Sequence, residues 1–352
     1  MKIEKVYLED CCDILDSMRV PITAADREPG PHPYYGANGI QDYVSDYIFD
    51  DELVLLAEDG GNFGSKDRPI AYRVSGKCWV NNHAHVLKPH DDMNVDYLCY
   101  SLMFYNVDGL INGATRQKLT QATMRKMEIP KLPLEAQLEI VEKLNRLTQI
   151  RDNKKKQLEL LDELIKARFV ELFGDPITNS KNLTTNDLRD VLALKAGDFT
   201  AASDITDKPT DGNKYPCYGG NGIRGYVAEY NQEGEYSLIG RQGALSGNVQ
   251  YAKGKFKNTE HALLVTPIVE MNSIWLNQLL INLDLQRYQT GAAQPGLSVK
   301  NLQEIQIITV SLEEQEQFAA FVEQTDKSKV VVQKSLDKAQ LLLDSLMQKY
   351  FG

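Results

Sequence analysis

Residues 134–174, LEAQLEIVEKLNRLTQIRDNKKKQLELLDELIKARFVELFG, decide the fold of this chain. Apolar residues recur in this stretch at spacings of three and four, and no glycine or proline interrupts it before Gly174. This pattern is typical of a single amphipathic helix. At a rise of 1.5 Å per residue the helix would be about 60 Å long, which is too long to fit inside a small domain.

The same pattern returns at residues 312–352, LEEQEQFAAFVEQTDKSKVVVQKSLDKAQLLLDSLMQKYFG, at a constant offset of 178 residues. A soluble helix of this length is only marginally stable alone, so its apolar stripe needs a partner. We therefore expect the two helices to pair as a coiled coil. The alternative, a solvated helical linker, does not explain why the stretch is duplicated at the same length.

The preceding segments are duplicated as well. The sequence PYYGANGI at 33–40 is matched by PCYGGNGI at 216–223, and residues 93–174 align with 271–352 without a gap. Asn-Gly between aromatic and β-branched residues is a strong signal for a β-hairpin. Each half is therefore expected to be an α+β domain of about 130 residues followed by a helical arm.

Other elements of each half follow from local patterns. Asn94 and Asn272 each precede an apolar periodic run and are predicted to be helix N-caps. Equivalent strands are predicted at 53–57 and 236–239, where each strand leads into a glycine-rich loop, and at 79–87 and 256–265. The loops differ between the halves, which favours two domains that do one kind of task on two different targets.

The composition indicates an ordinary soluble globular protein, with 42% hydrophobic and 25% charged residues in a chain of 352. The cysteines show no C-x-x-C spacing, which argues against a zinc site or a disulfide framework. The start of the chain is too polar and acidic for a signal peptide, and no stretch has the character of a membrane span. We expect a cytoplasmic protein that does not contact a membrane.

The net charge of −10 argues against nucleic-acid binding through bulk charge. Local charge differs, because segments 111–127 and 241–257 contain lysine and arginine but no acid. Such segregation is compatible with basic clefts on an acidic body. A solvated basic face is the alternative for each segment.

Motifs for catalysis are missing from the sequence. It contains no G-x-x-x-x-G-K-[ST] phosphate loop and no Asn-Pro-Pro-Tyr or Asp-Pro-Pro-Tyr segment for amino-methyl transfer. The G-x-G-x-x-G match at 220–225 does not precede a predicted helix. His83 and His85 alternate onto one predicted strand face, but no third metal ligand recurs in the second half, so hydrogen-bonded or core histidines are expected. The pattern favours a binding protein without catalytic residues, metal or cofactor.

Several of these features occur together in one known family. The hairpins at 35–39 and 218–222, the Gly-Arg-x-Gly loop at 240–243, the segment NNHAHV at 81–86, and the Leu-Glu-x-Gln entry to a long arm ending in Phe-Gly-Asp-Pro at 173–176 carry the resemblance. In this order and duplication the chain resembles the DNA specificity (S) subunit of type I restriction-modification enzymes. It departs from the pattern at residues 57–60, where acids replace the basic residue of the Gly-Arg-x-Gly loop.

The resemblance implies a fold and a set of partners. The fold class is α+β, with two repeated globular α/β target recognition domains separated by two long antiparallel helices that form a coiled coil. The implied boundaries are 1–133 for the first recognition domain, 134–174 for the central helix, 175–311 for the second recognition domain and 312–352 for the C-terminal helix. Each domain would recognise one half of a bipartite, asymmetric site in double-stranded DNA. Two methyltransferase (M) subunits and restriction (R) subunits would dock, and S-adenosylmethionine, ATP and Mg would belong to those partners.

Basic side chains are expected to contact phosphates, and hairpin and loop residues to approach base edges. The expected DNA-contacting residues are Arg116, Lys118, Lys126, Arg241, Gln242, Lys255, Lys257, Lys300, Tyr35, Asn38, Tyr218 and Asn221. For the asparagines the alternative is turn geometry alone, and for each cation it is a solvated surface position. Two other functions stay open: a specificity subunit of a methyltransferase-nuclease system without a translocating restriction subunit, and a coiled-coil scaffold without a DNA role.

Overall fold

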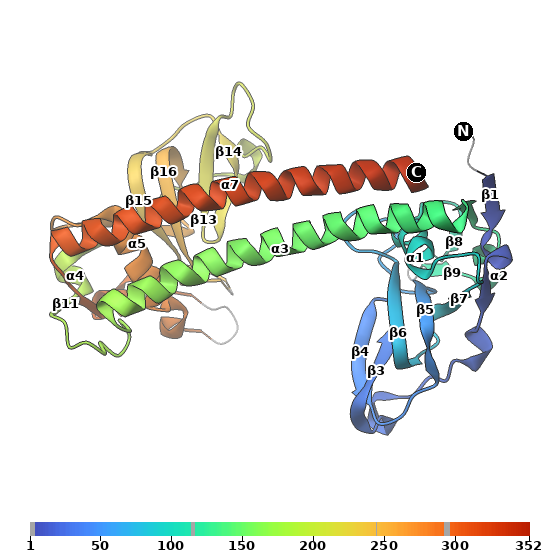
Figure 1. Cartoon of the computed structure of the whole chain (residues 1–352). Coiled ribbons are helices and arrows are strands. Elements are labelled where there is room, and N and C mark those ends of the chain that lie inside the picture. Colours follow the sequence, from blue (N-terminus) through green and yellow to red (C-terminus); the bar gives the residue numbers. More distant parts are fainter. Residues whose placement is uncertain (1–3, 114–116, 244, 292–295) are drawn as a thin grey trace. The chain divides into compact units, whose positions relative to one another are not determined.

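The computed structural model describes residues 4–113, 117–243, 245–291 and 296–352. These residues form two compact units (Figure 1). Unit 1 comprises Met1–Lys154 together with Ser335–Gly352, and unit 2 comprises Lys155–Lys334. Within the described ranges, no helix combines the length and the apolar character needed to span a membrane.

Unit 1 contains a six-stranded sheet with the strand order β2-β7-β5-β6-β3-β4. Neighbouring strands are antiparallel except for β3 and β6, which are parallel. Side chains of β5 alternate between two apolar clusters, because Leu53 and Leu55 face one side and Val54 and Leu56 face the other. The strands are β2 (Cys12–Ile14), β3 (Pro29–Gly36), β4 (Gly39–Val44), β5 (Phe49–Ala57), β6 (Ala71–Val80) and β7 (Ala84–Pro89).

One face of this sheet is covered by helix α1 (Val95–Met103), whose Tyr97, Leu98 and Leu102 are fully buried. The N-terminal strand pairs antiparallel with the strand that leads into the long helix. The remaining elements are β1 (Glu4–Tyr7), β8 (Ile111–Asn112), β9 (Lys118–Leu119), β10 (Glu128–Lys131), α2 (Gln121–Met124) and the 3-10 turns η1 (Leu8–Asp10), η2 (Asp16–Met18) and η3 (Ala24–Asp26).

Unit 2 repeats this plan with the strand order β12-β17-β15-β16-β13-β14. Its parallel pair is β13 and β16, the counterpart of β3 and β6. Its strands are β11 (Thr185–Asp187), β12 (Leu192–Ala196), β13 (Tyr215–Gly219), β14 (Gly222–Val227), β15 (Gln232–Gly240), β16 (Val249–Asn258), β17 (Ala262–Pro267) and β18 (Gln306–Ile308). Its short helices are α4 (Leu188–Val191), α5 (Ser273–Asn282), α6 (Val299–Gln303), η4 (Ala202–Asp204) and η5 (Leu285–Tyr288).

The predicted single strands at 79–87 and 256–265 are wrong. Each segment contains the end of one strand, a turn and the start of another. In unit 1 the Asn81 side chain accepts a hydrogen bond from the His83 N–H (2.8 Å), which turns the chain. In unit 2 the Ala262 N–H donates to the Thr259 carbonyl (3.1 Å) and closes the equivalent turn. His83 therefore lies in a turn and His85 in β7, so the two do not share one strand face.

The two long helices are α3 (Leu134–Phe173) and α7 (Leu312–Phe351), as the sequence predicts (Figure 1). In unit 2 the Phe169 ring contacts the Phe318 ring (centroids 5.4 Å apart), while Asp162 pairs with Lys329 (2.5 Å). Residue numbers fall along one helix as they rise along the other, so the helices are antiparallel there. In unit 1 the first turns of α3 bury Leu144 against the same cluster as Leu343 of α7.

A buried glutamine joins each long helix to the recognition domain of its unit. The Asn94 side chain caps α1, and its own backbone N–H donates to Gln137 Oε1 (2.8 Å). The Asn272 N–H donates to Gln315 Oε1 over the same distance in unit 2. The N-cap asparagine and the Leu-Glu-x-Gln motif are therefore two parts of one junction.

Candidate nucleic-acid interface

Three loops of unit 1 meet where the strands β3, β5 and β6 end. The Asn38 amide Nδ2 donates to the Gly60 carbonyl (3.0 Å), which joins the hairpin tip to the end of β5. The Asn81 N–H donates to the Tyr35 carbonyl (3.0 Å), which brings in the turn between β6 and β7. We call this surface rim 1, formed by residues 35–39, 58–60 and 81–83.

Unit 2 assembles the same surface. The Thr259 N–H donates to the Tyr218 carbonyl (3.1 Å), as Asn81 does to Tyr35. The hairpin lies so close to the end of β15 that a Cβ atom at Gly240 would be 2.1 Å from the Gly220 carbonyl oxygen, which explains the glycine. We call this surface rim 2, formed by residues 218–222, 241–243 and 259–261.

Glu58 and Arg241 occupy equivalent positions on the two rims. The backbone N–H of Glu58 donates to the His83 carbonyl (2.9 Å), and that of Arg241 donates to the His261 carbonyl (3.1 Å). The Glu58 carbonyl accepts a hydrogen bond from the Leu119 N–H of β9 (2.7 Å). The Arg241 carbonyl accepts one from the Leu297 N–H (2.9 Å). The rims thus share a backbone but carry side chains of opposite charge at this position.

The next residue on each rim is held by a histidine. The Asp59 Oδ1 atom lies 2.7 Å from His83 Nδ1. The Gln242 Oε1 atom lies 2.7 Å from His261 Nδ1. The same contact therefore occurs twice, with a carboxylate in unit 1 and an amide in unit 2.

Glu58 is neutralised by two cations. Its carboxylate lies 2.6 Å from Arg19 Nη1 and 2.9 Å from Lys118 Nζ. Burial alone would raise the pKa of Glu58, but the hydrogen bonds from Arg19 and Lys118 outweigh it and lower that pKa. The charge of Glu58 is therefore compensated on rim 1, and Lys118, a predicted DNA contact, already forms an ion pair with Glu58.

Beneath rim 1, Asp16, Glu58 and His85 lie close enough to hold a metal ion. Their ligand atoms are already engaged, however. His85 Nδ1 lies 2.6 Å from Asp16 Oδ2, and His85 Nε2 lies 2.9 Å from the Leu119 carbonyl. Since Arg19 and Lys118 already balance the carboxylates, the group fits a buried ionic network better than a metal site.

Arg241 has a different environment from Glu58. Its Nε atom is buried and has no hydrogen-bond partner among the described residues. A buried guanidinium nitrogen without an acceptor is costly, and a phosphate or base acceptor satisfies it only if the side chain moves to expose this atom. Gln242 beside it is exposed.

The structure places four more predicted residues on the rims, in mainly structural contacts. Asn38 bonds to Gly60, and Asn221 accepts from Asn248 (2.8 Å). The half-buried Tyr35 ring stacks on the Tyr72 ring (5.7 Å). The Tyr218 ring meets the Phe256 ring edge to face (5.5 Å). Burial raises the pKa of both tyrosines.

The other predicted cations lie outside the two rims. Lys255 and Lys257 lie on β16, where they pair with Glu233 (3.7 Å) and Asp198 (3.5 Å). Exposed Lys126 follows α2, and exposed Lys300 lies on α6. Arg116 lies outside the described residues.

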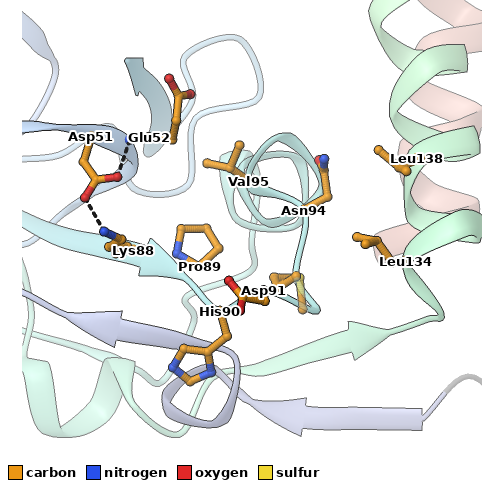
Figure 2. Close-up of a pocket in the computed structure, with 11 residues that line it drawn as sticks. Asp51, Glu52, Lys88, Pro89, His90, Asp91, Asn94, Val95, Leu134 and Leu138 are labelled. Atoms are coloured by element: carbon orange, nitrogen blue, oxygen red, sulfur yellow. Dashed lines mark hydrogen bonds and ion pairs between the residues drawn. The ribbon is translucent and has the colours of Figure 1, made fainter. Parts of the chain in front are cut away.

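A pocket of about 340 Å³ lies elsewhere in unit 1, between the end of β7, α1 and the start of α3 (Figure 2). Lys88 at its edge is bonded to Asp51, while Leu134 and Leu138 of α3 form an apolar side. Of the predicted DNA-contacting residues that the structure describes, none lines it. Six of the predicted residues lie on the rims instead: Tyr35, Asn38, Tyr218, Asn221, Arg241 and Gln242.

Sequence reasoning did not assign His83 and His261 to the DNA-contacting set. Their matched positions could have identified them. His83 is the last residue of the turn that follows β6, and His261 is the last residue of the turn that follows β16. The mistaken prediction of a continuous strand hid that turn.

Two similar domains, each with a rim of turns and a paired long helix, define a duplicated recognition module. A family model described as the type I restriction modification DNA specificity domain matches the chain twice, at residues 2–162 and 181–339. The chain belongs to this family.

Individual relatives agree with this assignment. The chain is 43% identical over 139 residues to the type I restriction enzyme EcoprrI specificity subunit of Escherichia coli. It is 38% identical over 149 residues to a putative type I restriction enzyme specificity subunit of Haemophilus influenzae. The alignments cover 40% and 42% of this chain and only 35% and 38% of those relatives.

The fold is also similar to that of solved structures. A type I restriction-modification S subunit from M. genitalium aligns over 100% of this chain and 97% of its own, with a TM-score of 0.67 and 18% identity. A second chain, from a structural study of complex assembly and conformational transition in the type I R-M system, aligns over 100% of this chain and 99% of its own, with a TM-score of 0.56 and 16% identity. At these identities the likeness concerns the fold.

Proposed function

We propose that this chain is the non-catalytic DNA specificity subunit of a type I restriction-modification complex. Each rim recognises one half of a bipartite, asymmetric site in double-stranded DNA. The observation that carries the proposal is that two family-matched domains present equivalent rims with unlike side chains, Glu58-Asp59 in one and Arg241-Gln242 in the other. One backbone with two side-chain sets suits two different half-sites.

Two kinds of contact with DNA are expected, one to the phosphates and one to the base edges. Phosphates are neutralised, and the register on the duplex is set, by Lys118, Lys126, Arg241, Lys255, Lys257 and Lys300. Rim side chains approach base edges in the major groove, where each base pair presents a distinct pattern of donors and acceptors. Two methyltransferase subunits and restriction subunits bind this chain in the cytoplasm, and they supply S-adenosylmethionine, ATP and Mg.

The test is methylation mapping. The chain is co-expressed with its methyltransferase partner subunit in a host without restriction systems, and methylated adenines are located by single-molecule sequencing. We expect one motif made of two specified half-sites and a constant unspecified spacer. Methylation at a single uninterrupted motif, or none in the presence of an active methyltransferase, would overturn the proposal.

A further inference from the structure

The paired positions Asp59 and Gln242 are the most closely matched side chains on the two rims. Their backbones are fixed alike, because Asp59 forms a β-bridge with Lys118 and Gln242 forms one with Gly296. Their side chains are fixed alike by His83 and His261 over the same 2.7 Å. Asp59 and Gln242 therefore have equivalent backbone positions within their own units, and each side chain is directed by an equivalent histidine.

The histidine of rim 2 is itself held in place. His261 Nε2 lies 3.1 Å from Glu260 Oε1, and its Nδ1 lies 2.7 Å from Gln242 Oε1. Gln242 and Glu260 thus hold the ring from both of its nitrogen atoms. Among the described residues the Gln242 side chain bonds to His261 alone, so Oε1 keeps one lone pair and both hydrogens of Nε2 remain available.

This arrangement suits one base. Glutamine pairs with adenine through two hydrogen bonds, donating to N7 and accepting from the N6 amino group. The amide of exposed Gln242 retains both functions after His261 has fixed its plane. A side chain held in this way loses less conformational entropy on binding.

The carboxylate of Asp59 offers a narrower choice. An ionised carboxylate only accepts hydrogen bonds. In the major groove the matching donors are the N4 amino group of cytosine and the N6 amino group of adenine. Lys118 is bridged to Asp59 through the backbone, while its Nζ atom lies 2.9 Å from the Glu58 carboxylate.

We propose that Asp59 and Gln242 are the base-selecting residues at equivalent positions of the two half-sites. Gln242 selects adenine, and Asp59 selects a base that offers an amino group. His83 and His261 are positioning residues that fix these side chains. This inference rests on the proposed function, because it names which residues of the two rims choose the base.

The first experiment replaces Gln242 by an isosteric carboxylate. Gln242→Glu keeps the contact to His261 but cannot donate to N7, so the preference for adenine over cytosine at one base pair of the second half-site should fall by about tenfold or more, as expected for a lost bidentate contact. The first half-site should not change. Gln232→Glu, at the opposite end of β15, is the control with the same charge change and should leave both half-sites unaltered.

The second experiment separates positioning from folding. His261→Ala should relax the same base pair that Gln242→Glu alters, while His261→Asn, which keeps an N–H near the place of Nδ1, should restore most of the preference. A structural role alone would weaken binding to all sequences equally. Asp59→Asn, which adds an amide donor, should change one base pair of the first half-site and leave the second intact.

The outcomes distinguish this inference from the function on which it rests. If the wild-type chain directs no bipartite methylation, the proposed function fails. If the wild-type motif is bipartite and Gln242→Glu leaves every base preference intact, only the inference fails. Should a variant abolish methylation, binding of the S and M subunits to a randomised duplex library replaces the readout, and a uniform loss over all sequences would also overturn the inference.

Discussion

Asp16 shows how a buried charge supports rim 1. Burial would raise the pKa of its carboxyl, but the hydrogen bond and charge of His85 lower it below the ordinary value, with further help from the Val86 N–H and Arg19. A depressed folded-state pKa means that the stabilisation is fully present above the unfolded pKa of about 3.9 and is lost as pH falls through the folded value. Unit 1 should therefore be sensitive to acid.

We expect Asp16→Asn to destabilise the chain by about 2 kcal/mol or more at pH 7, because it removes the buried carboxylate that bonds to the His85 ring, the Val86 N–H and Gln121. Thermal unfolding from pH 7 down to pH 3 measures this, and the gap between wild type and variant should shrink below about pH 4. Asp207→Asn, at an exposed position, is the matched control and should unfold like the wild type at every pH. A gap that stays constant with pH would contradict the assignment.

The predicted cations should differ in their effect on DNA affinity. Arg241 has a buried, unpaired Nε among the described residues, whereas Lys257 is paired with Asp198 and its side chain is only 19% exposed. Arg241→Gln should lower the slope of log affinity against log salt by about 0.9, the value for one phosphate contact, and Lys257→Gln should lower it less. Filter binding with the assembled methyltransferase between low and moderate salt tests the order. The reverse order would place the contact on β16.

At the scale of single residues, the sequence indicated which residues lie in the turns of the rims, but it did not indicate which side chains contact them. Asn38, Asn221 and Gln242 follow from local glycine-rich turns, which depend on neighbouring residues alone. The contact of Gln242 with His261 joins residues 19 positions apart and exists because the sheet brings two turns together. No local pattern reports such a contact, and the same holds for the ion pair of Lys257 with Asp198, which are 59 residues apart.

Among the elements, the junction between N-cap and long helix is the most regular. Gln137 is fully buried and forms three hydrogen bonds, to the Asn94 N–H and to the Asp92 and Leu132 carbonyls. Removing it leaves buried polar groups unsatisfied, at about 1–3 kcal/mol for each group. The sequence signals at both ends of this junction were recognisable, but their connection was not.

Gln137→Ala should therefore lower the free energy of unfolding by several times more than Gln149→Ala, an exposed substitution in the same helix. Gln315→Ala in unit 2 should behave like Gln137→Ala, since Gln315 bonds to the Asn272 N–H and the Val310 carbonyl. Denaturant titration followed by circular dichroism measures both. Equal effects of Gln137→Ala and Gln149→Ala would show that the junction does not stabilise the fold.

The long helices were predictable almost to the residue, because no glycine or proline interrupts 40 residues in either copy. The strands were less so. Their turns at 81–83 and 259–261 contain no glycine or proline and depend on side-chain to backbone or strand-end hydrogen bonds. A period of two persists across such a turn, and so the pattern indicated one strand instead of two.

At the scale of the whole molecule, the two units contain equivalent elements, but unit 1 is built from two separate stretches of the chain and unit 2 from one. Unit 1 takes its last helical segment from the end of the chain, where the Phe351 ring meets the Tyr97 ring (5.2 Å). In unit 2 the equivalent Phe173 ring meets Trp275 (6.0 Å) within a continuous stretch of chain. The C-terminal segment is therefore part of the first recognition unit.

Phe351→Ala should accordingly destabilise unit 1 by about 2 kcal/mol, less than the roughly 3–5 kcal/mol of a fully buried phenylalanine because this ring is partly exposed. Hydrogen exchange should increase in α1 and leave α5 unchanged. Phe173→Ala is the matched variant and should show the opposite distribution. Faster exchange in both units after either substitution would contradict the assignment of the helix ends.

The last prediction concerns the spacer between the half-sites and rests on the proposed function. Helices α3 and α7 have the same length and no break, so we expect helix rise to set the spacer. One helical turn is about 5.4 Å and one base-pair step about 3.4 Å, so inserting four residues within 149–156 should lengthen the spacer by roughly one or two base pairs and leave both half-sites unchanged. Deleting one turn should shorten it. Four residues inserted in the exposed loop at 207–211 serve as the control and should not alter the motif. If methylation persists with the original spacer after the helix insertion, the helices do not set the spacing.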